Sequence, residues 1–69
     1  MLLGGIMKKF NITALIYFKL DSSKQTIFMN EIIAAPSEYE AKILFRNKLE
    51  SAYEVVKIYS VEEIIKVAS

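Results

Sequence analysis

The sequence predicts a two-layer α+β domain of ββαβ layout, in which one helix covers one face of a three-stranded, mainly antiparallel sheet. Three observations carry this prediction. The 69 residues have the length of a single domain, and 54% apolar with 25% charged residues is a globular composition. Apolar residues alternate with others near the start of the chain, as in a strand. A proline and a helix-capping pattern then separate two β-prone segments from a helical one.

The first strand is predicted over Lys9 to Leu20, and it has one wholly apolar face. That face holds every second residue, namely Phe10, Ile12, Ala14, Ile16, Phe18 and Leu20. A period of two residues is typical of a strand that lies on a core. Residues 21–24 are polar side chains that favour a turn, and Gln25 to Ala35 is again β-prone. Two strands joined by a short polar turn indicate an antiparallel hairpin.

A helix is predicted over about residues 37–52. Pro36 biases the preceding residue toward an extended backbone, and Ser37 and Glu40 have the spacing of a capping box. The apolar stripe expected to face the sheet consists of Ala41, Leu44, Phe45, Leu49 and Ala52. A charged row at i, i+4 spacing, expected to face water, consists of Glu38, Lys42, Arg46 and Glu50.

The third strand is predicted over Tyr53 to Tyr59. Ser60 and Glu63 repeat the capping-box spacing, while Ile64, Ile65 and Val67 suit either a short helix or a continued strand. The favoured interpretation is a frayed turn or short C-terminal helix after Tyr59. The helix connects the second strand to the third. A right-handed parallel crossover that skips one strand gives the sheet order 2-1-3, with the first strand in the centre.

The apolar content exceeds what one helix can cover. The second strand is apolar on both sides, so the open face of the sheet takes either Ile27, Met29 and Ile33 or Phe28, Ile32 and Ala34. This surplus predicts a protein-binding surface on the open face or an edge strand, used for a homodimer or for a target protein. The alternative is that Val61 to Val67 folds over the open face and closes it.

The composition excludes several chemistries. The chain contains no histidine and no cysteine, so cysteine nucleophiles, serine–histidine dyads, thiolate zinc sites and disulfides are absent. No catalytic, cofactor-binding or metal-binding residue is predicted, and an enzyme would need a site assembled from several chains. Glu31 interrupts an apolar strand, so it is expected either on the open face beside Tyr17 or Lys19, or at a bulge.

The expected function is therefore non-enzymatic binding of a protein. The residues predicted to contact the partner are Tyr17, Lys19, Phe28 and Glu31, with Lys42 and Arg46 as a second surface. The alternative is a nucleic-acid or ribonucleoprotein accessory protein that stacks bases on Tyr17, Phe28 and Tyr59 beside Lys19, Lys57 and Arg46. The formal net charge of +1 favours the protein partner, because lysine and arginine supply most affinity for a nucleic-acid backbone.

The start of the chain predicts no export and no membrane span. The longest apolar run, Ala14 to Phe18, is far shorter than the roughly 20 residues that cross a bilayer. Lys8 and Lys9 follow the first apolar stretch, which reverses the order in a secretory signal, so a cytoplasmic protein is expected. Gly4 and Gly5 can be encoded by a ribosome-binding sequence, and one hypothesis is that translation begins at Met7. The alternative is an ordinary flexible or strand-leading N-terminus.

The segment Ala35-Pro36-Ser37-Glu38-Tyr39-Glu40-Ala41, between a hairpin and a helix, resembles a pattern in short proteins of ββαβ layout. Such proteins include small accessory proteins of bacteriophages and mobile elements and, more distantly, a small archaeal large-subunit ribosomal protein. The resemblance spans Lys8 to Tyr59, and the basic surface of the ribosomal protein is missing here. The phage-like branch implies a non-enzymatic protein in the host cytoplasm that inhibits or modulates one host factor, such as a defence factor, by occlusion. No functional residue is implied.

Overall fold

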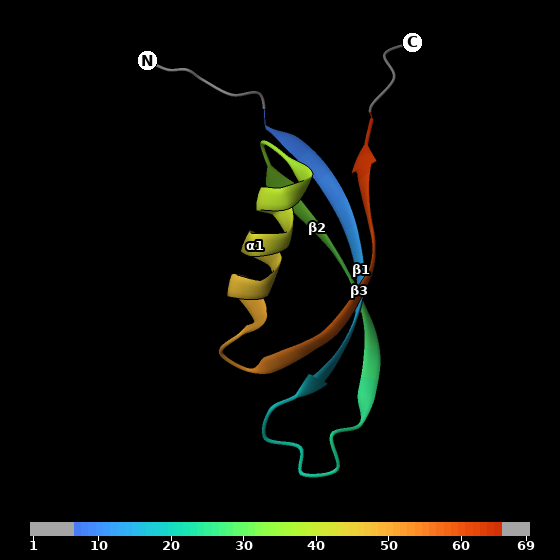
Figure 1. Cartoon of the computed structure of the whole chain (residues 1–69), viewed down its shortest axis with the longest axis vertical. Helices are drawn as coiled ribbons and strands as arrows, with labels where there is room; N and C mark the ends of the chain where they lie inside the picture. Colours follow the sequence, from blue (N-terminus) through green and yellow to red (C-terminus); the bar gives the residue numbers. More distant parts are fainter. Residues whose placement is uncertain (1–6, 66–69) are drawn as a thin grey trace.

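The computed structural model describes residues 7–65 and shows the predicted two-layer fold. Within this range the chain forms β1 (Lys8–Phe18), β2 (Thr26–Ala35), α1 (Glu38–Leu49) and β3 (Tyr53–Ile64). The three strands make one antiparallel sheet in the order β2-β1-β3, and α1 lies against one face (Figure 1). The ββαβ layout and the sheet order are confirmed. Residues 1–6, which bear on the hypothesis of a start at Met7, lie outside the described residues.

β1 is the central strand. Among residues 7–65 nine apolar residues are buried, and β1 supplies four of them, namely Phe10, Ile12, Ala14 and Ile16. The residues between them are half-buried on the other face, as the alternation predicts. The strand ends at Phe18, two residues before the predicted end. Leu20 lies in the turn that follows and is exposed.

The pairing of β1 with β2 decides which side of β2 faces the helix. Phe10 pairs with Ile33 and Ala14 pairs with Met29, so the odd-numbered residues of β2 share the helix-facing side. Ile33 is 8% exposed, whereas its neighbour Ile32 is 57% exposed. Of the two sets left open by the sequence, Phe28, Ile32 and Ala34 therefore lie on the open face.

Glu31 faces α1, so the expectation that it lies on the open face or at a bulge is wrong. It pairs with Ile12 in an uninterrupted register. Its carboxylate lies 2.8 Å from the Lys48 Nζ, which reaches it from the helix. A half-buried carboxylate beside apolar side chains needs a compensating cation, and here a residue 17 positions away supplies it.

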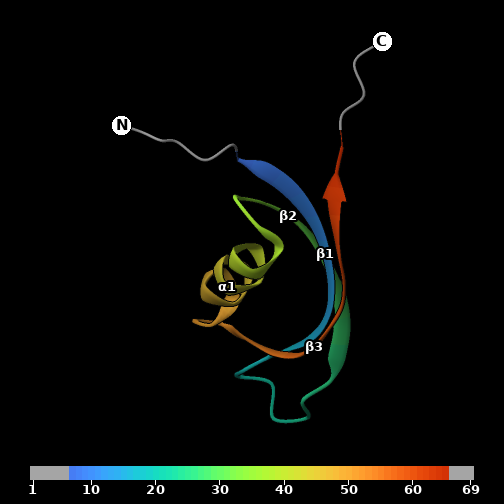
Figure 2. The ribbon, with the colours of Figure 1, turned by 45° about the horizontal axis from the view of Figure 1, so that its top comes forward.

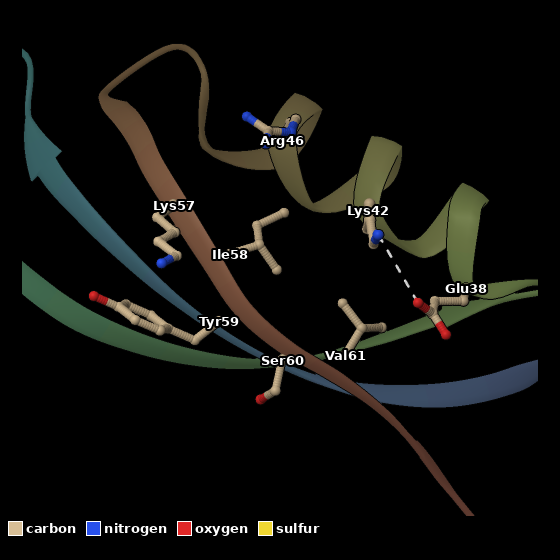
Figure 3. A pocket seen from close by; sticks show the side chains of 8 residues that line it. All are labelled: Glu38, Lys42, Arg46, Lys57, Ile58, Tyr59, Ser60 and Val61. Atoms are coloured by element: carbon tan, nitrogen blue, oxygen red, sulfur yellow. Dashed lines mark ion pairs between the residues drawn. The ribbon is translucent and has the colours of Figure 1, made fainter.

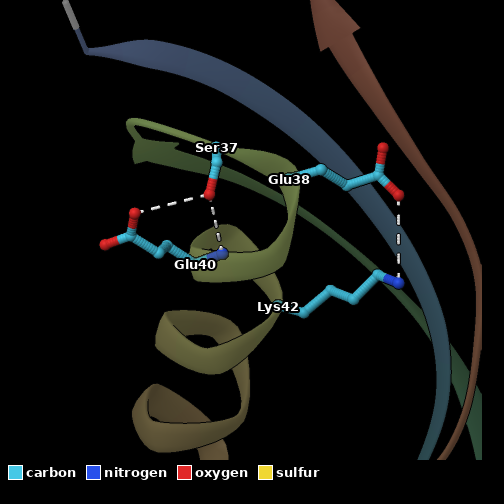
Figure 4. Close-up of polar contacts among 4 residues, drawn as sticks. All are labelled: Ser37, Glu38, Glu40 and Lys42. Atoms are coloured by element: carbon cyan, nitrogen blue, oxygen red, sulfur yellow. Dashed lines mark hydrogen bonds and ion pairs between the residues drawn. The ribbon is translucent and has the colours of Figure 1, made fainter. Parts of the chain in front are cut away.

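The predicted cap of α1 is present. The Ser37 hydroxyl accepts a hydrogen bond from the Glu40 backbone amide at 3.3 Å, which satisfies one of the free amides of the first turn (Figure 4). The Glu40 carboxylate lies 3.4 Å from the Ser37 hydroxyl, where it accepts from that hydroxyl rather than from the Ser37 amide. The Lys42 Nζ lies 3.8 Å from the Glu38 carboxylate one turn earlier.

Fewer residues of α1 pack against the sheet than the apolar stripe predicts. Ala41, Phe45 and Leu49 are buried against the sheet, but Leu44 is 43% exposed, so its predicted place in the contact is wrong. Leu44 directly precedes Phe45 and therefore points about 100° away around the helix axis. The helix ends at Leu49, before its predicted end, because residues 50–52 turn the chain into β3.

β3 continues to Ile64, so the predicted turn or helix after Tyr59 is wrong. Lys9 of β1 pairs with Ile64, and the pairing runs from there to Phe18 and Tyr53. Backbone groups along this edge of β1 need partners, and a continued strand satisfies more of them than a local cap does. As far as Ile64, the same pairing contradicts the alternative that this segment covers the open face. Residues 66–69, including Val67, lie outside the described residues.

The turn between β1 and β2 is built around Asp21. Its carboxylate accepts from the Ser23 hydroxyl at 2.7 Å and from the backbone amides of Ser23 at 3.0 Å and Gln25 at 3.3 Å. Lys24 adopts a positive φ of 54°. The Ser23 side chain is the main cause of a lowered pKa of Asp21, followed by the Ser23 amide, because these bonds favour the charged carboxylate.

We expect the Ser23→Ala variant to raise the pKa of Asp21 toward its ordinary value. A carboxyl whose pKa is lower in the folded state stabilises the fold above its unfolded pKa. This contribution disappears as the pH falls through the folded pKa. The check is an NMR titration of the Asp21 carboxyl, with Ser22→Ala as the control because the Ser22 side chain makes no bond to this carboxylate within the described residues. Identical titration curves for the two variants would contradict the expectation.

Candidate protein-binding surface

We call the sheet face opposite α1 the open face. The strand pairings arrange its residues in five rows across β2, β1 and β3. These rows are Ala34–Lys9–Ile64, Ile32–Asn11–Glu62, Asn30–Thr13–Ser60, Phe28–Leu15–Lys57 and Thr26–Tyr17–Glu54. The sheet curves around α1, so the open face is convex (Figure 2). No described element covers it.

An aromatic pair lies near the middle of the open face. The ring centroids of Phe28 and Tyr59 are 5.5 Å apart. Because β1 lies between the strands that carry them, the two rings meet above β1. Phe28 is 69% exposed and Tyr59 is 50% exposed. The Lys57 Nζ lies 5.0 Å from the centre of the Tyr59 ring, a cation–π contact that keeps this charge beside the aromatic pair.

An irregularity in β3 positions Tyr59. The register of β3 on β1 shifts between Thr13 and Ala14, where Ser60 is followed by Ile58 as the paired residue. Tyr59 is therefore an extra residue in β3, and a bulge of this kind redirects a side chain. In Figure 3 its ring lies on the side of β3 away from the helix, together with Lys57.

The central row of the open face is polar. The Asn30 Nδ2 donates to the Thr13 hydroxyl at 3.0 Å, and Ser60 completes the row on β3. In the next row the Asn11 Oδ1 is buried and accepts no hydrogen bond from the described residues. Beyond this polar strip, apolar residues continue on β2 with Ile32, so the open face combines apolar area with hydrogen-bonding groups.

The charges of the open face balance. Lys9 and Lys57 are its basic residues, and Glu54 and Glu62 are its acidic ones. Nucleic-acid sites need an excess of lysine and arginine, whereas protein interfaces combine both signs at the rim of an apolar centre. The composition of this face favours a protein partner.

A groove runs between α1 and the edge strand β3, and its lining includes Lys57, Tyr59 and Ser60, which also border the open face. Its volume is about 480 Å³, and its lining comprises Glu38, Lys42, Arg46, Lys57, Ile58, Tyr59, Ser60 and Val61. Ile58 and Val61 point toward the helix, and the carboxylate of Glu38 faces Lys42 across one wall (Figure 3). A smaller hollow of about 220 Å³ adjoins it at Arg46. Charges of both signs line this groove, and an ion pair already occupies part of it.

The residues predicted as partner contacts do not form one site. Tyr17 and Phe28 lie on the open face. The Lys19 Nζ contacts the backbone carbonyl of Glu50 on the helix side, and Glu31 is paired with Lys48 there. Lys42 and Arg46 line the groove between α1 and β3, away from Tyr17 and Phe28.

The third strand predicted from the sequence ends at Tyr59 and therefore leaves Glu62 and Ile64 out of the open face, where the structure places both. Both belong to the segment expected to leave the sheet after Tyr59. The sequence carries a signal for a longer strand, because Val61, Ile64 and Ile65 are β-branched. The local capping pattern of Ser60 and Glu63 competes with that signal in the sequence alone.

The described residues contain no group of three or more acidic, histidine or cysteine side chains that could hold a metal ion. Within the same residues, no helix is long and apolar enough to cross a membrane. No protein-family model, curated protein or solved structure matches the chain.

Proposed function

We propose that this chain is a small protein-binding module without a catalytic centre, and that the open face is its contact surface. The observation that carries the proposal is the exposed aromatic pair of Phe28 and Tyr59 on a sheet face that no described element covers. The solvent face of a one-sided antiparallel sheet is ordinarily polar. Aromatic residues exposed together are instead typical of protein interfaces.

The rest of the open face supports the same proposal. Ile32 is 57% exposed and extends the apolar area along β2, while Leu15 lies half-buried between Phe28 and Lys57. The balanced lysine and glutamate residues around this area suit a mixed protein surface. The proposed mode of action is occlusion, in which the small domain covers a surface that its partner uses elsewhere. An origin in a phage or mobile element, and a role against a host defence factor, stay predictions that rest on the resemblance alone.

The test compares two exposed aromatic residues on opposite sides of the molecule. Phe28, on the open face, is 69% exposed, and Tyr39, in the first turn of α1, is 73% exposed. Each is changed to aspartate in a tagged chain, which is used to capture proteins from a lysate of the source cell. We expect at least one protein to be retained by the wild type and by Tyr39→Asp but lost with Phe28→Asp. The affinity of that protein, once purified, should fall tenfold or more.

Circular dichroism of both variants shows whether the fold is intact, which is expected because neither side chain belongs to the core. Equal retention by Phe28→Asp and the wild type would contradict the open face as the contact surface. Retention of an oligonucleotide that survives near-physiological salt and depends on Phe28 would instead support the nucleic-acid alternative.

A further inference from the structure

We infer that the partner on the open face is a second copy of this chain, packed face to face about a two-fold axis that crosses the strands at the Thr13 row. This inference rests on the proposed function, because it names the occupant of the same surface. In a two-fold contact the same patch serves both copies, so the patch must be complementary to itself after rotation. The rows of the open face meet this requirement.

Under this rotation each strand lies over the same strand of the second copy, and the two strands run in opposite directions. Each of the two rows beside the Thr13 row then faces the other of these rows in the second copy. The row of Phe28, Leu15 and Lys57 therefore faces the row of Ile32, Asn11 and Glu62 of the second copy. Phe28 meets Ile32, which joins two exposed apolar side chains. Lys57 meets Glu62, which joins opposite charges, and symmetry makes each contact twice.

Neither Lys57 nor Glu62 forms an ion pair with another described residue. The ion pairs among the described residues join Lys8 to Glu63, Lys42 to Glu38 and Lys48 to Glu31. Lys57 and Glu62 are thus available for contacts between copies.

The other face-to-face arrangement is unfavourable. An axis parallel to the strands would exchange β2 and β3 within each row. It would place Phe28 over Lys57 and Ile32 over Glu62 of the second copy. Neither contact would then join two apolar side chains or two opposite charges, and Ile32 over Glu62 costs desolvation without forming an ion pair. The pattern on the face therefore selects the axis that crosses the strands.

A dimer in which the β3 strands of the two copies pair edge to edge is also less favourable. The register shifts twice along β3, between Thr13 and Ala14 and between Leu15 and Ile16 of its partner strand. Bulges of this kind twist an edge strand and hinder the addition of a further strand. The convex open face restricts contact to its three middle rows, which are the rows that carry the complementary residues. A contact of this limited size is expected to give a dissociation constant in the micromolar range.

The test uses two charge reversals measured by analytical ultracentrifugation over a concentration series. The wild type should show a monomer–dimer equilibrium. Lys57→Glu places like charges opposite each other twice, and so does Glu62→Lys, so each variant alone should dimerise at least tenfold more weakly. When the two variants are mixed, both contacts join opposite charges again, so a heterodimer should form with nearly wild-type affinity. The double variant should also recover the homodimer.

Lys42→Glu is the matched control, because Lys42 lies on α1 and this reversal should leave the dimer unchanged. A wild type that stays monomeric at several hundred micromolar would overturn the inference. So would a dimer that either reversal leaves intact, or one that mixing fails to restore. If the chain is monomeric while Phe28→Asp still loses a captured protein, the inference fails and the proposed function stands. If neither effect occurs, both fail.

Discussion

Phe45→Ala is expected to remove most of the stability of this domain. Phe45 is one of the largest fully buried side chains, and it joins α1 to the sheet. Truncating a buried phenylalanine costs about 3–5 kcal/mol in unfolding free energy, through lost transfer energy and the cavity that remains. A domain of this size has a total stability near the lower end of about 5–15 kcal/mol. Chemical denaturation should therefore show a variant that is unfolded or nearly so in buffer.

Leu44→Ala is the control for this prediction, because Leu44 is the neighbouring helix residue and is 43% exposed. Its truncation should cost no more than about 1 kcal/mol, since little apolar surface returns to water. The pair tests which arc of α1 packs on the sheet. Equal losses of unfolding free energy from the two substitutions would show that Leu44 also packs against the sheet, contrary to its exposed position in the structure.

Ile33→Ala is expected to have the second-largest effect, and it tests which side of β2 faces the helix. Ile33 is 8% exposed and pairs with Phe10 in the core. Removing its branched side chain should cost about 2–4 kcal/mol. The same substitution at the next residue, Ile32→Ala, should cost about 1 kcal/mol or less, because Ile32 is 57% exposed.

The two isoleucine variants should be compared by denaturation at a protein concentration low enough to keep the chain monomeric, since Ile32 belongs to the proposed dimer contact. The two sites are adjacent and have the same starting residue, so propensity and composition cancel in the comparison. A larger loss at Ile32 than at Ile33 would mean that the register of β2 is shifted by one residue, which reverses both faces of the strand.

The candidate surface was predictable only in part. The surplus of apolar residues and the place of Tyr17 on the open face follow from alternation in the sequence and are present in the structure. The side taken by Phe28 does not follow from alternation, because β2 is apolar on both sides. Lys19 and Glu31 were assigned to the same surface, but the structure places them on the helix side. Their partners come from α1 and the turn after it, and contacts of such sequence separation leave no local pattern.

The sequence by itself determined the elements whose signals are local and unopposed. The one-sided apolar alternation of β1 and the cap at Ser37 each have one physical solution, and the connection by a single helix yields the sheet order. Tertiary structure decided the features for which local signals conflict. β2 is apolar on both sides, so only its register on β1 selects the buried side. The end of the chain carries both a capping pattern and β-branched residues that suit a strand, and the unpaired edge of β1 selects the strand.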